Sequence, residues 1–164
     1  MLPLYLKKKN LMDFEWHFIK AGNFPDECYE DNMKLMFPAE AYILPKESQH
    51  QDFVLLAHEA LSYIFSIIQN NLKSVPWDRD DVDHFQGLIF RQMEELEKCM
   101  DVKITSSGDS SSPTKGKMLL KTYFETLEKL LKDKGYNICA WEIIRKEVLH
   151  NLQDFHKFLK RQKN

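Results

Sequence analysis

The chain has few of the residues that interrupt helices or that cross-link small domains. Its 164 residues include five glycines, six prolines and three cysteines. No apolar run approaches about 18 residues, the minimum for a transmembrane helix. A formal net charge of −2 gives no overall attraction to nucleic acid or to anionic lipid. We therefore expect no nucleic-acid partner and no insertion into a membrane.

The composition is that of an ordinary globular protein. Hydrophobic residues make up 43% of the chain and charged residues 29%, which argues against intrinsic disorder. A chain of this length buries roughly two thirds of its unfolded surface around a single core. The scarcity of glycine and the abundance of Leu, Lys and Glu in long periodic stretches favour helices. We predict one all-α domain over residues 1–164.

Apolar residues recur at steps of three and four in five stretches, and each stretch predicts an amphipathic helix. Turn and capping residues mark the ends of several of these stretches. Gly135, for example, is expected to end the fourth helix. The helices are expected roughly at Tyr5–Ala21, from Ser48 through Ile68, after Trp77 through Met100, from Pro113 to Gly135, and through Trp141 to Leu159.

A long connection, residues 22–48, joins the first two predicted helices. Pro25, Pro38 and Pro45 break helices and reject central strands. A loop this long within a compact domain is uncommon and often functional. Long crossover connections also allow neighbouring helices of a bundle to run parallel. We therefore expect a bundle of five helices with a long first crossover loop.

The most specific feature is the run Cys139–Arg145, which reads CAWEIIR on the last predicted helix. This run closely resembles the signature of the last helix of type I interferons. Shorter matches to the same family lie at Phe37–Pro38, Trp77–Asp78, Leu96–Cys99 and Lys121–Phe124. The resemblance spans nearly the whole chain, and it implies a helical cytokine that acts by binding and not by catalysis.

The subtype is left open by the residues that would distinguish it. The segment Phe24–Cys28 looks most like the kappa subtype, whereas the arrangement of the cysteines looks more like beta. The compartment is also open on the residues alone. The stretch Met1–Lys9 does not read as a signal peptide, because its apolar part is short and its basic part follows. The chain is either intracellular or a mature form whose signal has been removed, and the resemblance favours a secreted protein.

The resemblance also implies how the three cysteines are used. An odd number leaves at least one thiol free or paired with another molecule. The family pairs a cysteine of the first loop with the one that opens the last-helix run, which here are Cys28 and Cys139. A bridge across about 110 residues contributes roughly 4–5 kcal/mol in the chain-entropy model. Cys99 is expected to be free, because Met1 stands where alpha-type members have its partner.

Two receptor-binding surfaces follow from the resemblance. Type I interferons bridge two different receptor chains, which brings the attached Janus kinases together and switches on antiviral transcription. We therefore expect a secreted monomer whose partner is the two-chain receptor. The positions that match the high-affinity surface are Tyr29, Asn32, Leu35, Arg145, Lys146, Leu149 and Gln153. The positions that match the low-affinity surface are Phe65, Ser66, Asn70, Gln86, Phe90 and Lys121.

These positions depart from the family pattern in places. Asn32 replaces an arginine that is commonly a main anchor, and Asp154 stands at a usually apolar position. Tyr29 offers a replacement anchor. For Phe65 and Leu35 the alternative to a receptor contact is that the side chain is buried in the core.

A di-iron helical bundle is the alternative interpretation. Glu-x-x-His occurs at Glu47/His50 and at Glu147/His150, and two such pairs with two further carboxylates form a di-iron site. However, the first pair lies beside Pro45 at a helix start, and the first and fourth apolar rows offer no inward carboxylates. We therefore expect no metal, no cofactor and no enzyme. An intracellular helical protein or metalloenzyme is the competing class.

Overall fold

The computed structural model describes residues 25–31, 38, 41, 49–69, 77–99 and 115–162. Within these residues the chain forms helices and no strand, which confirms the all-α prediction for this part. The elements in chain order are η2 (Asp26–Asp31, a 3₁₀-helix), α2 (Gln49–Ile68), α3 (Arg79–Cys99), α5 (Lys115–Asp133) and α6 (Ile138–Gln162).

Two expectations are affected by these bounds. The helix predicted at Tyr5–Ala21 lies outside the described residues, and so does most of the predicted crossover loop. The expectation that residues 22–48 hold no helix is wrong for Asp26–Asp31, which form η2. This short 3₁₀-helix tolerates the preceding Pro25, because proline lacks only a donor that the first turn does not use.

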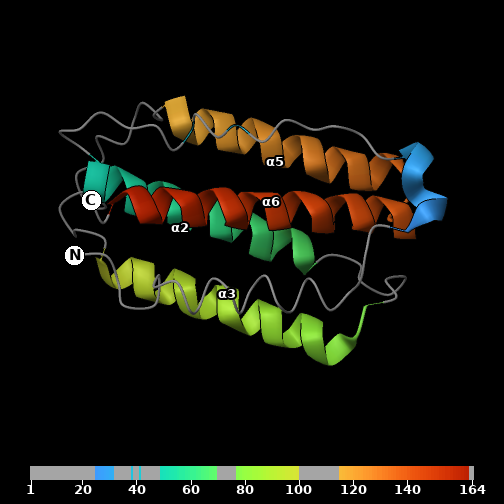
Figure 1. The fold of residues 1–164 in the computed structure, drawn as a ribbon, viewed down its shortest axis with the longest axis horizontal. Helices are drawn as coiled ribbons and strands as arrows, with labels where there is room; N and C mark the ends of the chain where they lie inside the picture. Colours follow the sequence, from blue (N-terminus) through green and yellow to red (C-terminus); the bar gives the residue numbers. More distant parts are fainter. Residues whose placement is uncertain are drawn as a thin grey trace.

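The described α-helices alternate in direction along the chain. In Figure 1, α2 and α5 run one way, and α3 and α6 run the other way. α2 packs against both α3 and α5, α5 also packs against α6, and η2 packs against α6. In this view α6 lies in front of α2, with α3 and α5 on its two sides. The arrangement is a helical bundle with η2 at one end.

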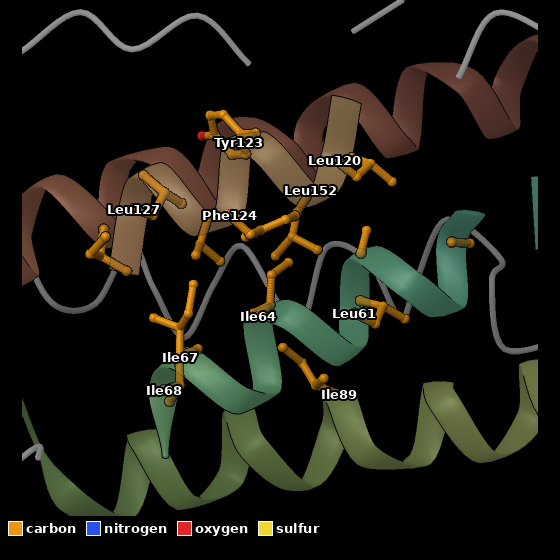
Figure 2. Close-up of a cluster of buried hydrophobic side chains, with 14 of the residues drawn as sticks. Leu61, Ile64, Ile67, Ile68, Ile89, Leu120, Tyr123, Phe124, Leu127 and Leu152 are labelled. Carbon is orange, nitrogen blue, oxygen red and sulfur yellow. The ribbon is translucent and has the colours of Figure 1, made fainter. Parts of the chain in front are cut away.

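One apolar core joins the helices. Figure 2 shows Ile64 and Ile67 of α2 directed toward Phe124 and Leu127 of α5, with Ile89 of α3 on the opposite side of α2. Burying each such side chain stabilises the fold by roughly 1.5–3 kcal/mol. The apolar rows predicted from periodicity are confirmed at Phe53, Leu56, Ala57, Ala60, Leu61, Ile64, Ile68, Phe85, Ile89, Leu96, Leu120, Tyr123, Phe124, Leu127, Leu130, Leu131, Trp141, Ile144, Val148 and Leu152.

α3 begins at a capped turn that orients Trp77. One carboxylate oxygen of Asp78 accepts hydrogen bonds from the backbone N–H groups of Asp80 and Asp81, at 2.9 and 3.1 Å. This is the arrangement of an N-cap residue. Trp77 precedes the cap, and both Trp77 and Val82 pack against the core. Apolar residues at these two positions fix the angle at which the chain enters a helix.

The turn between α5 and α6 is equally well defined. Gly135 has φ +62°, and the N–H groups of Tyr136 and Gly135 donate to the carbonyls of Leu131 and Lys132, at 2.8 and 3.0 Å. This pair of bonds is a Schellman cap, in which glycine takes the left-handed position without steric cost. The predicted stop at Gly135 is confirmed.

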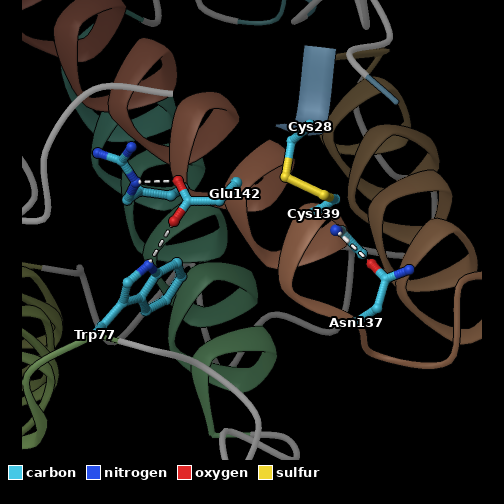
Figure 3. The surroundings of a disulfide bond; sticks show 7 residues. Cys28, Trp77, Asn137, Cys139 and Glu142 are labelled. Atoms are coloured by element: carbon cyan, nitrogen blue, oxygen red, sulfur yellow. Dashed lines mark hydrogen bonds and ion pairs between the residues drawn. A yellow bond between two sulfur atoms is a disulfide. The ribbon is translucent and has the colours of Figure 1, made fainter. Parts of the chain in front are cut away.

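α6 starts immediately afterwards. The side-chain oxygen of Asn137 accepts a hydrogen bond from the N–H of Ala140 at 2.8 Å (Figure 3). Asn137 is therefore the N-cap of α6. Tyr136 lies just before the cap, and its ring centroid is 6.4 Å from that of Trp141, the spacing of a hydrophobic staple. These contacts fix the direction of the first two turns of α6.

A buried polar contact also joins α5 to α6. The hydroxyl of Tyr123 donates a hydrogen bond to the carboxylate of Glu147, and Glu147 is only 2% exposed. Burial raises the pKa of Glu147, although the hydrogen bond from Tyr123 and the charges of Lys146 and His150 act in the opposite direction. The surroundings of Glu147 therefore favour the protonated form of its carboxyl group.

Replacing Gly116 by alanine is expected to destabilise the fold by about 1–3 kcal/mol. A Cβ at Gly116 would lie 2.7 Å from the carbonyl oxygen of Ala41 and 3.1 Å from Cδ2 of Leu56. Gly87→Ala is the matched control, because a Cβ there meets no atom within 4 Å. It should leave the free energy of unfolding in urea unchanged or raise it by up to about 1 kcal/mol. Equal effects of the two substitutions would contradict the close approach at Gly116.

Glu147→Gln is expected to flatten the pH dependence of stability. In the folded protein the pKa of Glu147 is raised above its ordinary value of 4.5. The protonated carboxyl group therefore makes its full contribution to stability at pH values below about 4.5. It is lost as pH rises through the folded pKa, because the folded state then gives up its extra proton. Urea midpoints measured across this window should fall with pH more steeply for the natural protein than for the variant. Glu94→Gln, at an exposed carboxylate of α3, controls for the change in net charge; a slope equally reduced by both variants would rule out a role for Glu147.

Candidate functional site

A disulfide attaches η2 to the first turn of α6. The sulfur atoms of Cys28 and Cys139 are 2.04 Å apart, their Cα atoms are 5.2 Å apart, and 111 positions separate the two residues in sequence. The predicted pairing is therefore confirmed. Figure 3 shows the bond beside Asn137, the residue that caps the same helix end. Cys99 is the last residue of α3, but its side chain lies outside the described residues, so its free state stays a prediction.

Four residues of the predicted high-affinity surface form what we call the η2–α6 face: Tyr29, Lys146, Leu149 and Gln153. Tyr29 directly follows the disulfide and is 60% exposed. The other three follow one another at steps of three and four along α6, and each is partly exposed. The disulfide thus holds an exposed tyrosine beside the first turn of α6, and the stripe begins about two turns further along the same helix. Asn32 and Leu35 lie outside the described residues.

Arg145 is buried, although its place among the predicted receptor contacts implies an exposed side chain. It is 6% exposed, and its Nε donates to Oε2 of Glu142 at 2.8 Å. Glu142 is itself 3% exposed. The Glu–Arg spacing of three residues would suit an exposed pair on a helix surface equally well. The burial is therefore a correction to the predicted exposure of Arg145, whereas its contribution to receptor binding stays a prediction.

The second oxygen of Glu142 is bound by Trp77, which lies just before α3. Oε1 of Glu142 accepts a hydrogen bond from the indole Nε1 of Trp77 at 3.0 Å. The ring of Trp77 also meets that of Trp141 edge to face, with 6.0 Å between centroids. We call these contacts the Trp77–Glu142–Arg145 network, and Figure 3 shows Trp77 reaching Glu142 from the start of α3. Sequence reasoning missed it, although the need of a buried indole N–H for an acceptor was a usable signal.

Part of the predicted low-affinity surface gathers where α2 meets α3. The ring centroids of Phe65 and Phe90 are 5.9 Å apart, and Phe90 is 47% exposed. Gln86 lies one turn before Phe90, and its side-chain nitrogen donates to the carbonyl of Ile68 at 3.3 Å. Ser66 is exposed beside Phe65. We call Phe65, Ser66, Gln86 and Phe90 the α2–α3 face.

Of the two remaining low-affinity positions, the structure describes only Lys121. Lys121 lies on α5, where its side chain is 65% exposed and its ammonium is 3.9 Å from Glu125. Asn70 lies outside the described residues. The core alternative for Phe65 is partly supported, because this side chain is half-buried and packs against the core.

The part of the chain that the structure describes offers no support for the di-iron alternative. It contains no group of three or more His, Cys, Asp or Glu side chains that could hold a metal ion. Glu147 instead binds Tyr123 in the α5–α6 contact, and the side chains of Glu47 and His50 lie outside the described residues. No helix among the described residues is long and apolar enough to cross a membrane.

Comparison with known proteins agrees with the sequence resemblance. Residues 2–162 match the interferon alpha/beta domain. Interferon a3 of Oncorhynchus mykiss is 32% identical over 125 residues, which cover 76% of this chain and 66% of that protein. Interferon omega-1 of Homo sapiens is 29% identical over 129 residues, which cover 78% of this chain and 65% of that protein. The aligned part thus spans slightly less than two thirds of the length of these relatives.

Solved structures show the same fold. Zebrafish interferon 2 superposes with a TM-score of 0.77 and 25% identity, over 92% of this chain and 97% of the other. Zebrafish interferon 1 superposes with a TM-score of 0.74 and 24% identity, over 94% of this chain and 96% of the other. Because the domain match covers residues 2–162 and one relative is 32% identical, the chain belongs to the type I interferon family, a family of cytokines and not of enzymes.

Proposed function

We propose that this protein is a secreted cytokine that bridges two different receptor chains on the cell surface. Bridging would bring the receptors' Janus kinases together and switch on antiviral gene expression. Membership of the type I interferon family supports this proposal. A single copy is sufficient, because the two candidate faces lie on different helices of one bundle. We therefore propose a monomer that acts between two receptor chains.

The observation that carries the proposal is the disulfide between Cys28 and Cys139. It holds Tyr29, which is 60% exposed, beside the first turn of the helix that carries Lys146, Leu149 and Gln153. A surface that is ordered before binding loses less conformational entropy on association. Tyrosine is also among the residues that most often anchor interfaces. We assign the high-affinity receptor chain to the η2–α6 face, with Asn32 and Leu35 contributing to the same contact.

The α2–α3 face is assigned to the low-affinity chain. The half-exposed ring of Phe90 lies against Phe65, so a receptor that covers it removes apolar surface from water. Ser66 and Gln86 supply polar groups beside the rings. We propose that Asn70 and the exposed Lys121 of α5 extend this contact.

Added to cells of its host species, the protein is expected to induce antiviral genes, and antibody against either receptor chain should abolish the induction.

Tyr29→Ala should weaken binding to the high-affinity ectodomain about tenfold or more, because it removes the exposed anchor. Phe90→Ala should act in the same way on the low-affinity ectodomain. Surface plasmon resonance with the two purified ectodomains measures both effects.

Lys132→Ala is the matched control for these variants, since Lys132 is exposed on α5 and belongs to neither face. It should bind both ectodomains like the natural protein. Gene induction that persists with both receptor chains blocked would contradict the proposal. A Tyr29→Ala variant that lost only low-affinity binding would contradict the assignment of the faces.

A further inference from the structure

We propose that Trp77, Glu142 and Arg145 are positioning residues for the η2–α6 face, so that Arg145 supports receptor binding without touching the receptor. The inference rests on the proposed function of that face. It differs from the expectation drawn from the sequence, in which Arg145 is itself a contact residue.

The network lies at the base of the face. Cys139, Glu142 and Arg145 occupy successive positions three residues apart along α6, so the disulfide and the buried ion pair share the same first two turns. Trp77 is the residue before the N-cap of α3, and its indole N–H donates to the carboxylate of Glu142. The start of α3 is thereby connected to the part of α6 that carries η2 (Figure 3).

Each oxygen of the Glu142 carboxylate accepts one donor, from Trp77 on one side and from Arg145 on the other. The side chains of Arg145 and Glu142 are only 8% and 4% exposed. Removing Arg145 would leave the buried carboxylate of Glu142 without its ion partner, and breaking a buried pair is far more disruptive than the loss of a surface pair. The network is therefore expected to hold the first two turns of α6 in one orientation.

The partly exposed residues of the face continue directly from this point. Lys146 follows Arg145, and Leu149 lies one turn further along the same helix. A change in the orientation of these turns would move both residues relative to Tyr29. The side chain of Arg145 is only 8% exposed and its Nε is held by Glu142, so little of the guanidinium surface is available for a direct receptor contact.

Trp77→Phe and Arg145→Met, alone and together, separate the two roles. Trp77→Phe keeps an aromatic ring but removes the N–H that binds Glu142. We expect it to weaken binding to the high-affinity ectodomain roughly three- to tenfold. Binding to the low-affinity ectodomain should be unchanged. The double variant should bind about as weakly as Arg145→Met alone, because both changes disable the same network.

Hydrogen exchange of the free protein gives a readout that does not need a receptor. Amides of η2 and of the first two turns of α6 should exchange about threefold faster or more in Trp77→Phe, with those of α2 unchanged. Tyr63→Phe is the matched control. It removes a hydroxyl that donates to Glu59 at 3.3 Å and keeps a ring that stacks on Phe124, so exchange in η2 and α6 and binding should stay as in the natural protein.

The possible results distinguish the inference from the proposed function. If Arg145→Met weakens binding while Trp77→Phe changes neither binding nor exchange, Arg145 is a contact residue and the inference is overturned. Independent, multiplying losses in the double variant would overturn it as well. If the natural protein binds neither ectodomain, the proposed function fails. The positioning role then stands or falls on whether exchange in η2 and early α6 is faster in Trp77→Phe.

Discussion

The covalent link between Cys28 and Cys139 is the constraint on which the candidate high-affinity face depends. It joins a segment that precedes the described α-helices to the first turn of the last one, 111 positions later. In the chain-entropy model a loop of this length stabilises the folded state by roughly 4–5 kcal/mol, by restricting the unfolded chain. The same bond holds η2 against α6. Stability and the geometry of the face are therefore provided by one interaction.

Three further contacts act on the helix end that the disulfide engages. Asn137 caps α6, Tyr136 packs on Trp141, and Trp77 binds Glu142 across from α3. Two of these contacts come from the turn that precedes α6, and the third comes from the residue before the cap of α3. The α2–α3 face depends instead on the core packing around Ile64 and Ile89. The two faces are thus supported by different interactions, which suits a molecule that meets two partners.

Much of the fold was accessible from the sequence because it depends on local signals. The apolar rows of the four described α-helices and the stop at Gly135 follow from periodicity and from the conformational freedom of glycine. The disulfide followed from the family resemblance, since spacing alone does not pair three cysteines. η2 departs from the expectation drawn from the prolines of residues 22–48, because a 3₁₀-helix can start directly after a proline.

The burial of Arg145 could not be predicted from its own helix. Periodicity along one helix shows which residues share a face, but it does not show which residue from elsewhere in the chain covers them. Nothing in α6 reveals that Trp77, 65 positions away, binds Glu142, the partner of Arg145. The carboxylate of Glu147 depends on another element in the same way, because its partner Tyr123 lies on α5.

The combined substitution Cys28→Ser and Cys139→Ser removes the link between η2 and α6, and stability and binding to both receptor ectodomains can be measured on the same protein. We expect a loss of about 2–5 kcal/mol in the free energy of unfolding. Under conditions where the variant is still folded, affinity for the high-affinity chain should fall much more than affinity for the low-affinity chain. A folded variant that binds both chains as the natural protein does would contradict the claim that the disulfide organises the η2–α6 face.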